Sequence, residues 1–325
     1  MVGLQPTGSS RALAAQVRAQ GLGGVILLGG WHQGRASVSP VTGRLQKAAG
    51  GDLLVAVDQE GGQVQQLRGS GFTRIPSARR QAQASVAAEE DAVTTWSGEL
   101  AKAGVNVNLA PVADTVPLDL GAGNAPIGRF GRDFAPGDAR TNARYAAAFV
   151  RGSLAAGIAP TVKHFPGLGR VTGNTDLTSS GTTDRTASTT DPYLEPFEAA
   201  IRAGAPLVMV SSARYPRLDA SNQAVFSKAV VSGLLRERMG YDGVVITDDV
   251  GAARAVAAVR VGDRATRFVA AGGDIVLTAD ASQAPVMLQA IAKRRKASSA
   301  FAAQVDAAAA RVLDLKADLG LVRCG

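Results

Sequence analysis

Short apolar runs rich in Val, Ile and Leu alternate with longer amphipathic stretches along the whole chain. Because the runs are brief and many follow glycine-containing turns, they predict buried strands rather than helices. These strands are expected at 1–4, 24–28, 53–57, 105–109, 159–163, 207–211, 243–247 and 274–278. The stretches between them predict helices at 9–20, 38–49, 82–103, 137–156, 193–203, 227–239, 261–271 and 299–318.

Strands that are apolar throughout and alternate with helices are typical of parallel strands whose outer face is covered. Eight such units fit a closed barrel better than an open sheet with helices on both faces. We therefore predict an α/β protein, a single (β/α)₈ TIM barrel over residues 1–325. One long irregular stretch, 166–191, interrupts the pattern, and its glycines predict a flexible functional loop.

The amino-acid composition excludes several classes of protein and of site. Hydrophobic residues make up 46% of the 325 residues, which is enough for a large core and excludes a disordered chain. A single cysteine, Cys324, excludes an internal disulfide, and only two histidines exclude multi-histidine metal centres. We expect no metal and no cofactor. The formal charge of +8 comes without an aromatic-interleaved basic patch, so no nucleic-acid partner is expected.

Polar and charged residues follow five of the predicted strands. They stand in the segments 58–62, 111–114, 163–167, 211–214 and 247–249. In a (β/α)₈ barrel the carboxyl ends of the strands meet at one face, where reactive groups lie. A single such residue would be read as a helix N-cap. Five strand ends with polar groups instead predict a shared pocket.

These segments, taken in order, resemble the β-N-acetylglucosaminidases of NagZ type in glycoside hydrolase family 3. The matching stretches are Val57-Asp58-Gln59-Glu60-Gly61-Gly62, Asn108-Leu109-Ala110-Pro111-Val112-Ala113-Asp114, Ile127-Gly128-Arg129-Phe130-Gly131, Lys163-His164-Phe165-Pro166-Gly167 and Thr247-Asp248-Asp249. The chain is similar to the one-domain branch of that family. The resemblance implies a retaining exo-glycosidase that removes terminal β-linked N-acetylglucosamine through a covalent aspartyl intermediate.

The resemblance also implies roles for individual residues. Asp248 is expected to be the nucleophile, and Asp58, Arg129, Lys163 and His164 are expected to grip the hydroxyls of the terminal sugar. A carboxylate accepts hydrogen bonds from hydroxyls, whereas Lys and Arg only donate, so the set suits a polyol. For the neighbouring Asp249, capping the helix after the seventh strand and a catalytic role are both open.

The loop after residue 167 departs from the family pattern. The NagZ type carries an Asp-Ser-His triplet there, whose His is the general acid/base, but this loop holds no histidine. Counting without gaps places Asn174 at the position of that Asp and Asp176 at the position of that His. We expect Asp176 to serve as acid/base in its place. Two alternatives stay open: Asp184 or Glu60 takes the role, or the acid is lost.

Other functions also compete. A Schiff-base lyase would use Lys163 as its nucleophile, and a carbohydrate-binding protein would bind sugar without turnover. A β-glucosidase-like preference is a third alternative. His32 and Trp31 follow the second strand and either line the mouth of the pocket or lie on the surface.

The expected substrates are N-acetylglucosamine-containing cell-wall (peptidoglycan) fragments, with no obligatory protein partner and a monomeric state. The expected location is the cell envelope or outside the cell, as a lipoprotein whose upstream segment has been removed, with the cytoplasm as the alternative.

Overall fold

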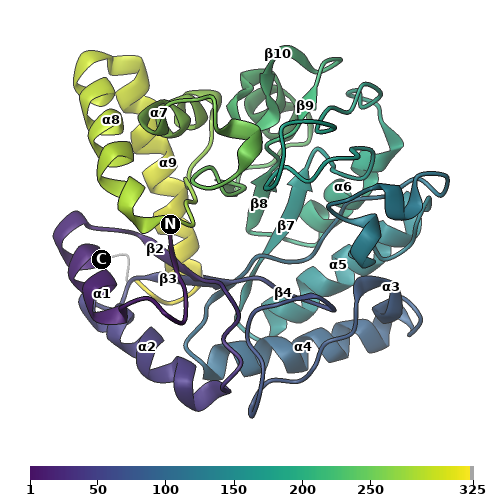
Figure 1. Cartoon of the computed structure of the whole chain (residues 1–325), viewed down its shortest axis with the longest axis horizontal. Coiled ribbons are helices and arrows are strands. Elements are labelled where there is room, and N and C mark those ends of the chain that lie inside the picture. The colour runs from purple at the N-terminus through teal and green to yellow at the C-terminus, as the bar shows by residue number, and fades with distance from the viewer. Residues whose placement is uncertain (323–325) are drawn as a thin grey trace.

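The computed structural model describes residues 1–322 and shows a TIM-barrel-like α/β fold (Figure 1). Seven parallel strands form one curled sheet, and all of their residues are buried. Their order in the sheet is β1 (Val2–Leu4), β2 (Gly24–Leu27), β3 (Leu54–Val57), β6 (Val107–Asn108), β7 (Ala159–Phe165), β8 (Leu207–Val210) and β11 (Val244–Thr247). Each strand matches one predicted from the sequence. The sequential order follows from the helical crossovers, which return the chain to the same end of the sheet each time.

The eighth predicted strand, 274–278, is not an extended strand in the structure. It makes isolated parallel bridges instead, from Ile275 to Ile246 of β11 and from Thr278 to Val2 of β1. The two edges of the seven-stranded sheet therefore face each other across this segment.

Helices cover the outer face of the sheet (Figure 1). They are α1 (Ser10–Gln20), α2 (Arg35–Ala48), α3 (Ala78–Gln81), α4 (Val86–Lys102), α5 (Ala139–Ala155), α6 (Glu195–Arg202), α7 (Val261–Ala271), α8 (Ala284–Ala297) and α9 (Ser299–Asp318). Ser9, Ser85, Asp138 and Ser298 accept hydrogen bonds from the first turns of α1, α4, α5 and α9. These residues satisfy backbone N–H groups that have no partner inside the helix.

Several elements differ from the prediction. The helix expected at 227–239 is a π-helix over Ala229–Arg238. Helix α8 was not predicted, because its apolar side chains do not keep to one face: Met287 is buried and Leu288 next to it is exposed. Two short hairpins were also missed, β4 (Gln59–Gly61) with β5 (Val64–Gln65) and β9 (Arg214–Tyr215) with β10 (Asp219–Gln223). Both follow strands at the carboxyl end of the sheet, where the site lies.

The interior of the curled sheet is filled by its own side chains, including Leu54, Val107, Met209 and Ile246. A second apolar layer packs the helices onto the outer face. Within residues 1–322, no helix is both long and apolar enough to cross a membrane.

Candidate active site

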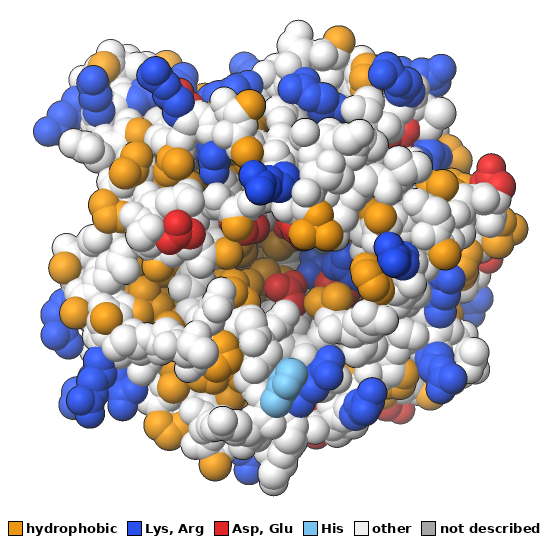
Figure 2. All heavy atoms as spheres, in the orientation of Figure 1, with side chains coloured by type: hydrophobic (Ala, Val, Ile, Leu, Met, Phe, Trp, Pro, Cys, Tyr) orange, Lys and Arg blue, Asp and Glu red, His pale blue; other side chains and the backbone are white. Residues whose placement is uncertain are grey.

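A cavity of about 310 Å³ opens at the carboxyl ends of the strands. Asp58 after β3, Lys163 and His164 at the end of β7, and Asp248 after β11 line it, and the loop after β7 adds Asp176. Figure 2 shows a hollow near the middle of this face, with acidic and basic side chains inside it. Five of the six predicted site residues are therefore together. Their roles remain predictions.

Four charged side chains form a connected network on one wall. The Lys163 ammonium lies 2.5 Å from Asp58 and 2.6 Å from Glu60. Arg132 donates two hydrogen bonds to the same Glu60, at 2.8 and 2.7 Å. Burial opposes ionisation of Glu60, but Arg132 and Lys163 outweigh it and lower its pKa to about 2. Burial likewise opposes the charge of Lys163, whose pKa is nonetheless raised by Asp58 and Glu60.

His164 is held by a buried carboxylate. Its Nδ1 lies 2.7 Å from Oδ2 of Asp114, which is fully buried. The other oxygen, Oδ1, accepts hydrogen bonds from the backbone N–H groups of His164 and Leu168. A carboxylate only accepts, so Nδ1 carries the hydrogen and Nε2 is directed to other partners. The ring therefore has a fixed orientation beside the cavity.

The two aspartates after β11 have different surroundings. Both line the cavity, and the hydrogen bond that the Asp248 carboxylate accepts comes from the Asp249 N–H at 2.9 Å. Asp249 instead accepts three backbone N–H groups, from Gly251, Ala252 and Ala279. Of the two roles left open for Asp249, these contacts favour capping, although the capped N–H groups belong to a turn and not to the expected helix.

Asp176 faces Asp248 from the loop after β7. The residue is exposed to solvent at the cavity mouth, although its carboxyl group points into a cavity lined by protein. Desolvation inside the cavity, together with the charge of Asp248, raises its pKa to about 7, although His164 acts in the opposite direction. A carboxyl group with this pKa holds a proton near neutral pH and can donate it.

The loop that carries Asp176 is tied down at its start. The Asn124 side chain donates to the carbonyls of Leu168, Gly169 and Val171 at 2.7, 3.0 and 2.7 Å. The prediction of a flexible loop rests on the number of glycines in this segment. One of them, Gly169, has no room for a Cβ atom, which would meet Thr115 O at 1.7 Å. This glycine serves close packing.

The loop is also tied across its two ends. Arg170 forms a bidentate pair with Asp191 at 2.5 and 2.8 Å, and it reaches Asp184 at 3.4 Å. Its guanidinium also lies over the Tyr193 ring, 4.0 Å from the ring centroid. The segment between these contacts is therefore held as one closed structure.

The structure does not bring Arg129 to the cavity. Its side chain is exposed, whereas Arg132, three residues later, lines the cavity and contacts Glu60. Both arginines lie in one short stretch, and a 3-10 helix over Gly128–Phe130 turns the first of them outward. The pairing with Glu60 is what marks Arg132 rather than Arg129 as a site residue. This contact joins distant segments of the chain and is not visible in the sequence.

The alternative acids occupy unsuitable positions. Asp184 is buried away from the cavity, where it accepts hydrogen bonds from Thr186 and Ala187 and contacts Arg170. Glu60 is paired with two cations and has a lowered pKa. Of the pair after β2, Trp31 is buried and donates to Leu28 O, and His32 is exposed outside the cavity.

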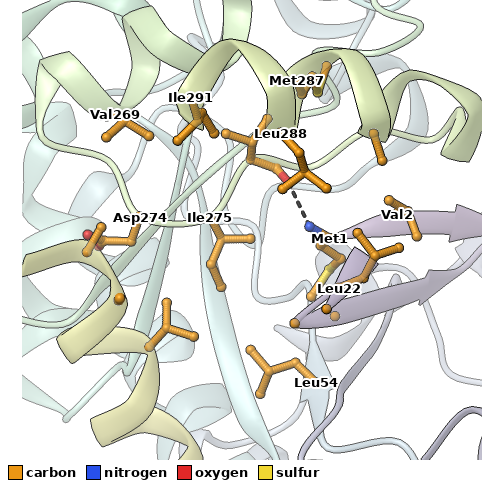
Figure 3. A pocket seen from close by; sticks show the side chains of 18 of the residues that line it. Met1, Val2, Leu22, Leu54, Val269, Asp274, Ile275, Met287, Leu288 and Ile291 are labelled. Carbon is orange, nitrogen blue, oxygen red and sulfur yellow. Dashed lines mark hydrogen bonds between the residues drawn. The ribbon is translucent and has the colours of Figure 1, made fainter. Parts of the chain in front are cut away.

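A second cavity, of about 570 Å³, lies at the opposite end of the strands (Figure 3). Met1, Leu22, Ile275, Leu288 and other apolar residues line it. Its one carboxylate, Asp274, is bound by Arg236 and Arg311. The Met1 amino group also lines this larger cavity, where it donates to Val276 O at 2.8 Å. The first cavity, which gathers the polar strand ends, is the candidate active site.

A cavity at the carboxyl end of a TIM-barrel-like sheet that holds carboxyl groups beside cations is typical of sugar-cleaving enzymes. The family model described as the glycosyl hydrolase family 3 N terminal domain matches residues 4–315. The chain belongs to this family and is a glycoside hydrolase, which confirms the resemblance seen in the motifs.

Individual relatives agree with this assignment. A beta-hexosaminidase of Xanthomonas oryzae pv. oryzae is 33% identical over 285 residues, covering 86% of this chain and 82% of that protein. The crystal structure of a beta-N-acetylhexosaminidase from Beutenbergia cavernae is 43% identical with a TM-score of 0.93, over 98% of this chain and 96% of the other. A family 3 beta-N-acetylglucosaminidase from Paenibacillus is 28% identical with a TM-score of 0.86, and this chain covers 62% of it.

Proposed function

We propose that this protein is a retaining exo-β-N-acetylglucosaminidase that uses Asp248 as nucleophile and Asp176 as acid/base. One observation carries the proposal: the two carboxyl groups line the same cavity, and burial and the charge of Asp248 raise the pKa of Asp176 to about 7. The family's Asp-His pair is absent from this loop, and Asp176 supplies a second carboxyl group of the kind that retaining enzymes use.

The chemistry proceeds in two steps. Asp248 attacks the anomeric carbon while Asp176 donates its proton to the glycosidic oxygen, so the bond to the leaving group breaks and a glycosyl ester forms. The ionised Asp176 then removes a proton from water, which attacks the same carbon and releases Asp248. Two inversions at one carbon retain the β configuration.

The network on the cavity wall fits the grip on the sugar hydroxyls. Lys163 donates, Asp58 accepts, and His164 presents Nε2, so both kinds of hydroxyl contact are available. Arg132 takes the place expected for Arg129, because it lines the cavity. At about 310 Å³ the cavity is at the small end of ligand pockets, which suits a single terminal sugar.

The acetylated sugar is favoured over glucose by the comparisons. The Xanthomonas and Beutenbergia proteins are named as hexosaminidases, and the latter shares nearly the full length of this chain. We further propose cell-wall (peptidoglycan) fragments as the source of this sugar and the cell envelope as the location. We also propose that the protein acts as a monomer without an obligatory protein partner.

The Schiff-base alternative fits the geometry poorly. A lysine nucleophile must lose its proton, yet Lys163 lies between two carboxylates that raise its pKa. Sugar binding without turnover would leave the raised pKa of Asp176 without a use.

We also propose that segment 274–278 closes the barrel as its eighth strand. Its backbone is hydrogen-bonded to both edges, with Thr247 N–H donating to Ile275 O at 3.0 Å and Gly3 N–H donating to Thr278 O at 2.9 Å. Closure would bring the segment's last residues beside Asp248 and Asp249.

The test is release of 4-nitrophenol from the β-N-acetylglucosaminide and the β-glucoside by wild type, Asp248→Asn and Asp176→Asn. We expect preference for the acetylated sugar, no turnover by Asp248→Asn, and slow turnover by Asp176→Asn that azide restores as the β-azide. Asp138→Asn, at the N-cap of α5, is the matched control. Sugar binding without any hydrolysis would overturn the catalytic proposal, and faster turnover of the glucoside would overturn the substrate.

A further inference from the structure

The backbone around Asp176 rests on the turn that follows Asp248. The Ala255 N–H donates to Thr175 O at 3.0 Å, and the Arg254 N–H donates to Asp176 O at 3.2 Å. The loop after β7 and the turn after β11 are therefore joined at the residue proposed as acid/base. The position of Asp176 relative to Asp248 depends on the conformation of residues 249–256.

Asp249 holds this turn through its N–H groups. Its Oδ1 accepts from Gly251 N at 2.8 Å and from Ala279 N at 2.9 Å, and its Oδ2 accepts from Ala252 N at 3.2 Å. The contact with Ala279 ties the turn to the end of segment 274–278. Both oxygens are thus engaged with backbone, and the carboxylate has a structural use next to the nucleophile.

Arg264 of α7 holds the same turn through its carbonyls. Its guanidinium donates to Val250 O at 2.7 Å, Gly251 O at 3.1 Å, Ala257 O at 3.4 Å and Val259 O at 2.8 Å. The side chain is buried and does not line the cavity. A planar fork of five N–H donors suits several carbonyls at once, which a lysine cannot match.

We propose that Asp249 and Arg264 are positioning residues that fix the spacing between Asp176 and Asp248. This inference rests on the proposed function, in which Asp176 donates the proton. Asp249 immobilises the N–H groups of the turn, and Arg264 immobilises its carbonyl groups. The N–H groups of Arg254 and Ala255, which contact the Asp176 loop, are therefore held at a fixed distance from Asp248. A displacement of about 1 Å at a reacting group can lower a rate about 100-fold.

The experiment compares N-acetyl-β-glucosaminides of phenol and of 2,4-dinitrophenol. Phenol leaves only with help from a proton donor, whereas dinitrophenol leaves without it. We expect Asp249→Asn and Arg264→Lys to lower kcat/KM about 10- to 100-fold for the phenyl substrate. For the dinitrophenyl substrate we expect a loss of no more than about threefold. Asp138→Asn is again the control, and circular dichroism checks the fold of each variant.

The outcomes separate this inference from the proposed function. If Asp176→Asn lacks the selective loss on the phenyl substrate, Asp176 is not the acid and the proposed function fails. If Asp176→Asn shows that loss and both positioning variants behave like wild type, this inference alone is overturned. An equal loss on both substrates by the two folded variants would also overturn it, because a general structural defect does not depend on the leaving group.

Discussion

The imidazole of His164 and the carboxylate of Asp114 form a buried pair in which Nδ1 lies 2.7 Å from Oδ2. Asp114 comes from the stretch after β6 and His164 from the end of β7, so the pair joins two neighbouring strand ends. The same carboxylate accepts the Leu168 N–H at 2.7 Å, where the loop that carries Asp176 begins. The buried Asp114 side chain therefore orients both the ring proposed to bind sugar and the start of the loop that carries Asp176.

Replacing Asp114 by Asn should disturb that orientation. An amide can donate to the ring as well as accept from it, which permits the other tautomer of His164. We expect kcat/KM to fall by about tenfold or more, with the Nε2-protonated form becoming visible in ¹⁵N NMR of the imidazole. An unchanged tautomer and unchanged kinetics would contradict a positioning role for Asp114.

The pH dependence should report the raised pKa of Asp176. Because the first chemical step needs the protonated acid, kcat/KM should decrease as the pH rises through about 7. The decrease should weaken for the 2,4-dinitrophenyl substrate and disappear in Asp176→Asn. Initial rates between pH 5 and 9, measured on both substrates, give the comparison. The same decrease in Asp176→Asn would assign it to another group.

Substitution of Arg132 and of Arg129 should have very different effects on KM. Arg132 pairs with Glu60 beside Lys163, whereas Arg129 is exposed. Arg132→Gln leaves a buried carboxylate with one cation fewer, so we expect KM to rise about tenfold or more. Arg129→Gln, its matched control, should change KM by less than about twofold. Steady-state kinetics on the 4-nitrophenyl substrate measure both, and a larger effect at Arg129 would show that the family's arginine acts from there.

Inorganic phosphate should not replace water as the attacking group. In the second step Asp176 is ionised, and its charge adds to the local negative charge that an incoming phosphate meets. A neutral histidine at this position would present no such repulsion. We expect unchanged turnover and no sugar 1-phosphate when phosphate is added at constant ionic strength. Detection of sugar 1-phosphate by ³¹P NMR would refute this prediction.

Burial of Glu89, away from the candidate active site, should make the free energy of unfolding depend on pH. Glu89 lies buried in α4, its Oε1 has no hydrogen-bond partner, and burial raises its pKa from 4.5 to about 7. The folded protein then holds a proton that the unfolded chain releases. The free energy of unfolding should therefore fall by about 3 kcal/mol between pH 4.5 and 7. Urea unfolding of Glu89→Gln should show a smaller decrease, with Asp91→Asn, an exposed position of the same helix, as control.

Local pattern was sufficient for much of the fold. Seven of the eight predicted strands are present, because fully apolar runs such as Val55 and Val57 of β3 must be buried. The eighth segment, 274–278, makes isolated bridges to both edges of the sheet rather than an extended strand. Helix α8 was missed because apolar residues lie on its exposed face as well as its buried face, with Val286 and Leu288 exposed and Met287 buried.

The site was predictable where it depends on strand ends. Asp58, Lys163, His164 and Asp248 follow buried strands, so the topology brings them together. The contacts that the sequence did not reveal join residues far apart in the chain. Arg132 meets Glu60 across 72 positions, and Asp114 meets His164 across 50. Such pairs depend on loop conformations, which leave no periodic signal in the sequence.

Hydrogen bonds hold the loop that carries Asp176 at several points along its length. Asn124 and Arg170 hold the loop at its start and across its ends, and Ala255 supports its middle. The residue proposed as proton donor is therefore held in place without sugar, so we expect little substrate binding energy to be spent on ordering it. We accordingly expect the slow step of turnover to be the making or breaking of bonds rather than closure of this loop.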